Sequence, residues 1–150
     1  MITVSQAREM LFALVGPLPE ETVPLARAAG RVLARDVSAR RDQPPFDASS
    51  MDGYAVQSAE VQKHAMFKVI GEAAAGHRFD GRVGPGQTVR IFTGAPLPEG
   101  ADFVVMQEDV TRSGDVITLA ADPGTSRHVR PRGADFRSGQ TVTAPRLVGP

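Results

Sequence analysis

Short apolar runs separated by glycine and proline dominate the chain from about residue 42 onward. All but three of its twelve prolines and most of its fifteen glycines lie in this part. Proline removes a backbone donor and ends helices, and glycine favours tight turns. The apolar runs have strand length and contain β-branched or aromatic residues, at 54–56, 67–70, 88–92, 103–107, 116–119 and 141–143, with turns expected at 84–86, 98–100 and 113–115. The pattern predicts a small, strongly curved β domain.

The first residues of the chain have helical periodicity instead. Apolar side chains recur at helical spacing, at Ala7, Met10, Leu11, Leu14 and Val15. Thr3 and Gln6 have the spacing of a capping box, in which each side chain satisfies a free amide at the helix start. A second short helix is predicted over residues 26–34, with Gly30 as an unfavourable interior residue. The sequence therefore predicts N-terminal helices before a mainly β chain.

Composition excludes several classes of function. Basic and acidic residues balance at 17 each, so no net charge points to nucleic acid or an anionic membrane. The absence of cysteine excludes disulfides and thiolate chemistry and agrees with a cytoplasmic protein. No apolar stretch has the length of a membrane span, and the N-terminus does not have the pattern of a signal peptide. No Gly-rich nucleotide-binding loop is visible either.

Two loops contain residues with the chemistry of a site. In the first, Asp52 follows a stiff, proline-led segment, and Gly53 is expected to adopt a positive φ that aims the carboxylate outward. In the second, a strand delivers Thr93 to a turn where its hydroxyl could face an oxyanion, and Gly94 would allow a ligand to approach closely. Taken singly, each pattern is explained as well by an ordinary turn.

Charged residues near two further strand ends are weaker candidates. Glu108 and Asp109 are oxygen donors of the kind that Mg²⁺ prefers, but neighbours on a strand point to opposite faces. Arg130 and Arg132 flank a proline and could hold phosphate, and Asp135 could act on a metal ion. A solvated charged turn explains the same residues.

Together these segments resemble the N-terminal region of the MoeA family and the related gephyrin E domain. The resemblance rests on PPFDASSMDGYAV, VGPGQTVRIFTGAPLPEGADFVVMQEDV and HVRPRGADFRSGQTV, and on TVPLARAAGRVLARDV near the N-terminus. It implies a coiled, bifurcated β-sheet subdomain, residues 44–136, inserted in an elongated helix-containing subdomain. By the same resemblance, the latter is formed by 1–43 and 137–150 and is expected to be incomplete in this sequence. The family's substrate-binding α/β domain and its C-terminal domain are likewise expected to be absent from it.

The resemblance also implies an activity, the insertion of molybdate into adenylylated molybdopterin with Mg²⁺ assisting and AMP released. Family positions with catalytic roles match Asp52, Thr93 and Asp135, of which Asp52 and Asp135 are the expected metal ligands. Cofactor-binding roles fall on Gly94, Arg130 and Arg132. The site would lie between two protomers of a homodimer joined through the elongated subdomain, so this chain alone should be inactive. Two departures, Ala134 for the family's Glu and Ala48 for its Asn, weaken a paired-carboxylate role and remove one loop hydrogen bond.

Two other hypotheses remain open. The chain could be a non-catalytic dimerisation or partner-docking module that uses the apolar face of its first helix. It could also be a stand-alone Mg²⁺-dependent phosphoesterase built on Asp52, Glu108 and Asp135.

Overall fold

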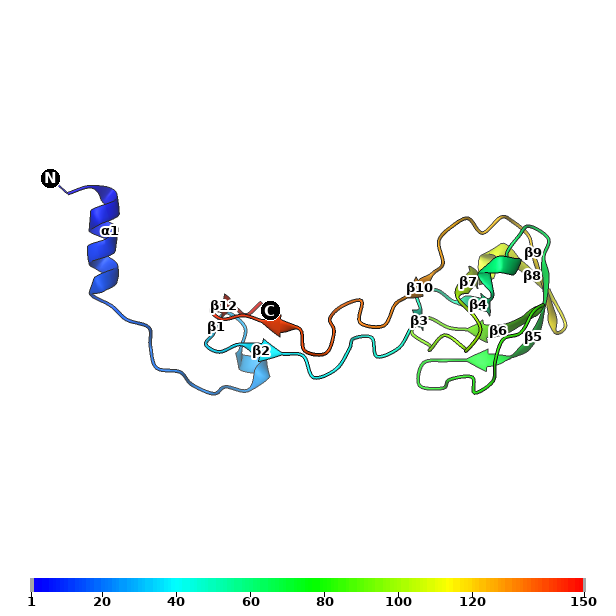
Figure 1. Ribbon diagram of the computed structural model, residues 1–150, viewed down its shortest axis with the longest axis horizontal. Coiled ribbons are helices and arrows are strands. Elements are labelled where there is room, and N and C mark those ends of the chain that lie inside the picture. Colours follow the sequence, from blue (N-terminus) through cyan, green and yellow to red (C-terminus); the bar gives the residue numbers. More distant parts are fainter. Residues whose placement is uncertain (1, 150) are drawn as a thin grey trace. The chain divides into compact units, whose positions relative to one another are not determined.

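A computed structural model describes residues 2–149, which separate into two units (Figure 1). Of the described residues, the first unit contains 2–37 and 141–149, and the second contains 38–140. Among the described residues, no helix has the length and hydrophobicity that a membrane span requires. The assignment of 1–43 plus 137–150 and of 44–136 to two family subdomains remains a prediction.

The second unit is built on a six-stranded sheet with the order β7-β4-β6-β5-β9-β8. Its strands are β4 (Gly53–Val56), β5 (Met66–Ala73), β6 (Gln87–Ile91), β7 (Phe103–Met106), β8 (Val110–Ser113) and β9 (Val116–Leu119). Every neighbouring pair is antiparallel except β5 and β6, which run parallel and are joined through residues 74–86. A register shift between Val69 and Gly71 interrupts that parallel ladder. Such irregularities bend a strand and increase its twist, in agreement with the predicted curvature.

Apolar side chains are buried on both faces of this sheet. Tyr54 and Val56 pack in one cluster with side chains from β5, β7 and β9, whereas Ala55 packs in a second cluster with Val89 and Val104. The split follows from the pleat, because successive side chains of a strand point to opposite faces. The buried Thr88 hydroxyl donates to the Ala55 carbonyl oxygen over 2.8 Å and so is satisfied.

Besides this sheet, the described residues form three short ladders and three single turns of 3₁₀ helix. β1 (Val32–Leu33) pairs with β12 (Arg146–Leu147), β2 (Val37–Ser38) with β11 (Thr141–Val142), and β3 (Ala48–Ser49) with β10 (Val129–Arg130). The 3₁₀ turns are η1 (Leu25–Arg27), η2 (Ser58–Glu60) and η3 (Gln107–Asp109). The strands expected from the apolar runs are therefore all present.

The first helix, α1 (Val4–Ala13), begins as the sequence predicts. The Gln6 amide donates to Thr3 Oγ1 over 3.2 Å, and the Thr3 amide donates to Gln6 Oε1 over 2.9 Å. This reciprocal pair is the predicted capping box, and it satisfies donors that the first helical turn leaves free. None of the α1 residues is buried.

The prediction of a second helix over residues 26–34 is wrong. The chain forms only the short η1 turn and then passes through Gly30 at φ +76°, a left-handed conformation that a helix interior does not contain. The Gly30 amide donates to the Val148 carbonyl oxygen over 2.9 Å, and Val32 pairs with Leu147. Tertiary pairing with the end of the chain therefore overrides the local apolar pattern.

Candidate functional site

The Asp52 carboxylate is held by Thr93 through two hydrogen bonds. The Thr93 backbone amide and its hydroxyl each donate to Asp52 Oδ1 over 2.8 Å. The amide bond, and then the hydroxyl bond, hold the pKa of Asp52 below its ordinary value, and the Arg90 charge contributes to the same effect. Among residues 2–149, no hydrogen bond is donated to the second oxygen, Oδ2. The carboxylate is thus ionised, oriented, and able to accept one further ligand.

Two turns bring this pair together. After β3, the Ser49 hydroxyl donates to the Met51 carbonyl oxygen over 2.6 Å and accepts from the Met51 amide over 3.3 Å, which leads the chain into Asp52. After β6, the Gly94 amide donates to the Ser49 carbonyl oxygen over 2.8 Å. The second turn is therefore docked on the strand that precedes the first. The contacts of Ser49 with Met51 are local, whereas the contact of Gly94 with Ser49 joins residues far apart in the sequence.

The glycines of these turns serve different purposes. Gly94 lies at φ +82°, where glycine is favoured, and a Cβ added there would meet no atom within 4 Å. Space beside it is open, as the expected approach of a ligand requires. Gly53 does not have the predicted positive φ, and that expectation is wrong. Glycine is needed there because a Cβ would lie 2.0 Å from the Val105 carbonyl oxygen of the neighbouring strand β7.

The second group of predicted residues is engaged in ion pairs. Arg130 pairs with Asp135, five residues further along the chain. Arg132 Nε donates to Asp42 Oδ2 over 2.5 Å, and the Arg132 amide donates to Asp47 Oδ1 over 2.7 Å. The backbone amide of Ser138, followed by the Arg132 side chain, lowers the pKa of Asp42. Both arginines that the sequence predicts to bind phosphate are therefore paired with carboxylates, Arg130 with Asp135 and Arg132 with Asp42.

Strand β3 connects the two groups. Ala48 pairs with Arg130 on β10 and also forms a bridge with Pro96, which follows the Thr93 turn. β3 therefore lies between the segment that carries Thr93 and the segment that carries Arg130. Within residues 2–149, no hydrogen bond or ion pair joins Asp52 directly to Asp135.

Sequence patterns miss three residues that shape these groups. Asp42 and Asp47 bind Arg132, and no spacing signal links either of them to that arginine. Arg90 donates to the Gly53 carbonyl oxygen over 2.8 Å and to Gln107 Oε1 over 2.5 Å. An arginine inside an apolar strand is a signal that could have found Arg90, because such a charge needs partners.

The acidic residues at the end of β7 do not form a metal cage. Gln107, Glu108 and Asp109 make up the turn η3, in which the Gln107 side-chain amide donates to Glu108 Oε1 over 3.1 Å. Among the described residues, no group of three or more His, Cys, Asp or Glu side chains could hold a metal ion. Any metal bound here would need ligands from elsewhere, such as water or a bound phosphate.

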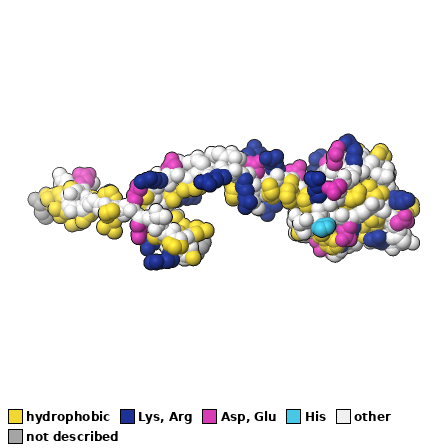
Figure 2. All heavy atoms as spheres, turned by 90° about the horizontal axis from the view of Figure 1, so that it is seen from below, with side chains coloured by type: hydrophobic (Ala, Val, Ile, Leu, Met, Phe, Trp, Pro, Cys, Tyr) yellow, Lys and Arg dark blue, Asp and Glu magenta, His cyan; other side chains and the backbone are white. Residues whose placement is uncertain are grey.

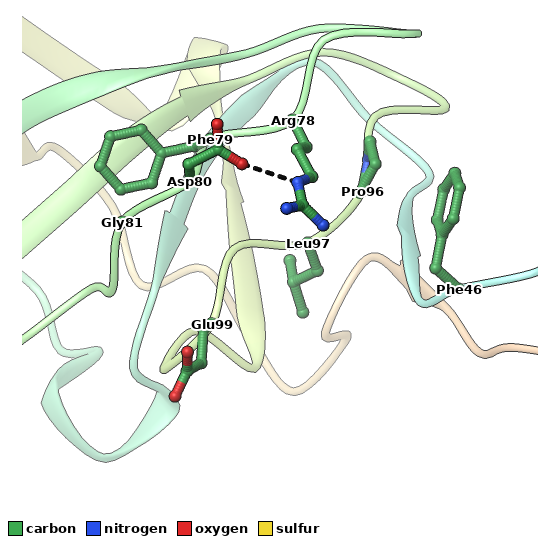
Figure 3. Close-up of a pocket in the computed structure, with 8 residues that line it drawn as sticks. All are labelled: Phe46, Arg78, Phe79, Asp80, Gly81, Pro96, Leu97 and Glu99. Carbon is green, nitrogen blue, oxygen red and sulfur yellow. Dashed lines mark hydrogen bonds and ion pairs between the residues drawn. The ribbon is translucent and has the colours of Figure 1, made fainter.

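A separate pocket of about 550 Å³ lies beside the loop 78–81 (Figure 3). Apolar side chains, including Phe46, Phe79 and Leu97, line it together with Arg78, whose Nε donates to Asp80 Oδ1 over 2.7 Å. None of the predicted site residues lines this pocket. It is therefore not the place where Asp52 and Thr93 could meet a substrate.

Comparison with known proteins identifies the family of this chain. The sequence profile of a family described as the MoeA N-terminal region (domain I and II) matches residues 2–148. The chain belongs to the MoeA family. Its mainly β fold, with one α-helix and a curled sheet, is that of the family's N-terminal region.

Similar proteins include two named molybdopterin molybdenumtransferase. The one from Haemophilus influenzae is 40% identical over 144 residues, which cover 95% of this chain and 36% of the relative. The one from Nostoc sp. is 35% identical over 148 residues, which cover 93% of this chain and 34% of the relative. A solved structure of the molybdopterin biosynthesis MoeA protein from Pyrococcus horikoshii OT3 matches with a TM-score of 0.83 and 32% identity, covering 97% of this chain and 40% of the other. The chain thus spans about a third of the length of the curated relatives it matches.

Proposed function

We propose that, within a full-length MoeA protein, this chain forms one wall of the site that inserts molybdate into adenylylated molybdopterin and releases AMP. Family membership and the names of the relatives support the reaction class. The observation that carries the proposal is the Asp52 carboxylate, which Thr93 orients through one oxygen while the other remains available. Molybdate and adenylylated molybdopterin are the proposed substrates.

The reaction makes two demands on the protein. Two thiol groups of the pterin bind molybdenum through sulfur and give up their protons to an oxo ligand of molybdate, which leaves as water. A second water molecule cleaves the phosphoanhydride that links the pterin to AMP. Both steps gather anions, which need positive charge and oriented donors around them. Because its pKa is lowered, Asp52 is ionised at neutral pH, so it suits the orientation of water or a cation better than proton donation.

Mg²⁺ is the proposed cofactor, and the Asp52 environment fits it as a single protein ligand. Mg²⁺ is usually bound by one or two carboxylates together with water and substrate phosphates. Asp52 Oδ2 would provide one such oxygen, and Mg²⁺ would neutralise phosphate charge when bound. Asp135, the second proposed ligand, is paired with Arg130 and would have to exchange that partner for the ion.

Thr93 acts through Asp52 in this proposal. A threonine hydroxyl has one proton, and that of Thr93 is directed to Asp52 Oδ1. The hydroxyl therefore cannot donate to an anionic substrate at the same time. Thr93 is accordingly a positioning residue for the carboxylate, which refines the substrate-binding role expected from the sequence.

Arg130, Arg132 and Gly94 would contact the phosphates or the pterin. A guanidinium has five donors, and a contact with one carboxylate leaves several of them for phosphate. Arg130 donates from Nη2 to Asp135, and Arg132 donates from Nε to Asp42. The open space beside Gly94 admits a ligand to the same turn that carries Thr93.

The other wall of the site would come from the α/β domain of a second protomer. The chain covers 36% of the Haemophilus influenzae relative, and the proposed substrate-holding domain lies outside the matched part. We therefore expect this chain alone to be inactive and the full-length protein to be a homodimer. The fold in hand supplies Asp52 and its support, and the partner supplies the surface that holds the pterin.

A chimera tests the proposal. The chain replaces the matching part of the Haemophilus influenzae relative, and AMP release is measured with adenylylated molybdopterin, molybdate and Mg²⁺. We expect an active chimera, no release by the chain alone, and a fall in kcat of about a hundredfold or more for Asp52→Asn. Asp115→Asn is the control. Asp115 lies in the turn between β8 and β9 and forms an exposed ion pair with Lys68, so this change should leave kcat unchanged. Release by the isolated chain, or full activity of Asp52→Asn, would refute the assignment.

A second function, assembly or partner docking, is favoured by one observation. Large apolar side chains of α1 are exposed, and Figure 2 shows hydrophobic atoms gathered over this helix. Met10 is 60% exposed, and Leu14, the C-cap residue directly after the helix, is 80% exposed. If assembly is the function, Met10→Glu with Leu14→Glu should abolish self-association in sedimentation, while Asp52→Asn with Asp135→Asn leaves activity unchanged.

A further inference from the structure

We propose that Arg90 is a positioning residue that fixes the backbone around Asp52, so that the carboxylate meets both donors of Thr93. The inference rests on the proposed function of Asp52. It concerns a side chain that has no assigned role in that function. Its support is geometric and comes from three neighbouring strands.

The Arg90 guanidinium holds the carbonyl group of Gly53, the residue that follows Asp52. Nη1 donates to the Gly53 carbonyl oxygen over 2.8 Å, and Nη2 donates to Gln107 Oε1 over 2.5 Å. The backbone amide of Gln107 in turn donates to the Asp52 carbonyl oxygen over 3.1 Å. The Gly53 carbonyl group is thus held directly by Arg90, and the Asp52 carbonyl group is held through Gln107. Rotation of this segment would carry the Asp52 side chain away from Thr93.

Aromatic rings fix the guanidinium itself. Its Cζ lies 5.1 Å from the centre of the Tyr54 ring and 4.6 Å from that of Phe92. Tyr54 is the cross-strand partner of Arg90, and Phe92 lies two residues further along, so the pleat places all three side chains on one face. Tyr54 belongs to the buried core. Cation–π contact with a buried ring restricts the arginine to the orientation in which both of its hydrogen bonds form.

The strand that carries Arg90 also delivers Thr93. β6 ends at Ile91, and Thr93 follows in the next turn. Arg90 therefore couples the start of β4, which follows Asp52, to the end of β6, which precedes the two donors. A lysine has the same charge but no planar fork, so it could not bridge Gly53 and Gln107 with the same geometry.

Hydrogen exchange on this chain tests the inference without any need for activity. The variants are Arg90→Met, which keeps an apolar stem against the rings, and Arg90→Lys. Arg112→Met is the matched control, because Arg112 is an exposed arginine on β8 that donates to the Gly114 carbonyl oxygen. The amides of Thr93 and Gln107, which both bond to Asp52, report on the site. The Leu119 amide, which donates to Ala65 over 3.0 Å, reports on the remote sheet.

In Arg90→Met we expect exchange of the Thr93 and Gln107 amides to accelerate about tenfold, with Leu119 unchanged within about twofold. Arg90→Lys should restore part of the protection, and Arg112→Met should change none of these amides. Unchanged exchange at Thr93, or acceleration of Leu119 by the same factor, would overturn the inference, because Arg90 would then have no role at the site or only a general one.

Kinetics of the chimera provide a second readout. Arg90→Met should lower kcat about tenfold while KM for adenylylated molybdopterin stays within about twofold, because the substrate contacts remain. A rise in KM with kcat unchanged would mean that Arg90 binds substrate and would overturn the positioning role. Full activity of Asp52→Asn would instead remove the proposed function, and the exchange experiment would still decide whether Arg90 orients the carboxylate.

Discussion

Thr93 directs two donors, its amide and its hydroxyl, to a single oxygen of Asp52, although the two residues are 41 positions apart in the sequence. Both turns are anchored on Ser49, through its side chain on one side and its carbonyl oxygen on the other. The carboxylate is therefore oriented by the tertiary structure before any substrate or metal ion binds. Preorganisation of this kind reduces the rearrangement that a reaction would otherwise require.

Removal of the Thr93 hydroxyl should lower the activity without abolishing it. In the chimera, we expect Thr93→Val to lower kcat about tenfold, because one of two hydrogen bonds to a charged acceptor is lost. Thr93→Ser retains the hydroxyl and should stay within about threefold of the parent. Equal losses in both variants would show that the methyl group, and not the hydrogen bond, is what matters.

Asp102 should make folding stability depend on pH. The Ser58 hydroxyl, then the Ser58 amide and the Arg127 charge, lower the pKa of Asp102. Because the folded pKa is lowered, the stabilisation is complete above the unfolded value of about 4 and is lost as pH falls through the folded value. Asp102→Asn should therefore lower the free energy of unfolding at pH 7 by about 1 kcal/mol, discounted because this side chain is 47% exposed.

Urea unfolding at pH 7 and at pH 3 measures this effect. The difference between the parent and Asp102→Asn should shrink at the lower pH, where the parent carboxylate begins to be protonated. Asp115→Asn, which removes a widely exposed pair with Lys68, is the control and should show little difference at either pH. A gap of constant size for Asp102→Asn would contradict the pKa assignment.

Gly53→Ala should destabilise the sheet. The added Cβ would lie 2.0 Å from the Val105 carbonyl oxygen, a backbone atom that cannot move without breaking the β4–β7 ladder. We expect a loss of about 3 kcal/mol, which thermal unfolding would measure. Gly84→Ala is the control, because its nearest neighbour is the flexible side chain of Gln87 at 3.1 Å. Similar melting temperatures for both variants would sink the close-packing explanation.

The capping box of α1 should control its helix content. Thr3→Ala removes the acceptor of the Gln6 amide and should cost about 1 kcal/mol of helix stability. Because α1 has ten residues and none of them is buried, its helicity depends strongly on such local terms. Ellipticity at 222 nm should fall for Thr3→Ala and change little for Ser5→Ala, an exposed serine of the same helix. Unchanged ellipticity for Thr3→Ala would mean that other contacts hold the helix.

Local patterns were sufficient for some elements and misleading for others. The short apolar runs and the Thr3–Gln6 spacing act over neighbouring residues, and the strands expected from those runs and the capping box are present as predicted. The apolar spacing of residues 26–34 is also local, but the positive φ of Gly30 and the pairing of Val32 with Leu147 prevent a helix in that segment. Likewise, Gly53 is required by a neighbouring strand and not by a turn.

The sequence by itself determined that the chain is mainly β, where the strands formed by its apolar runs lie, and which loops contain candidate residues, because turn chemistry and strand propensity depend on adjacent residues. Resemblance in the motifs also identified the family. Only the tertiary structure decided that Thr93 directs its hydroxyl to Asp52, that Arg130 and Arg132 are paired with carboxylates, and that Arg90 supports the loop. Those contacts depend on strand register and on turns docked across the sheet, and a one-residue change of register would turn each side chain to the other face.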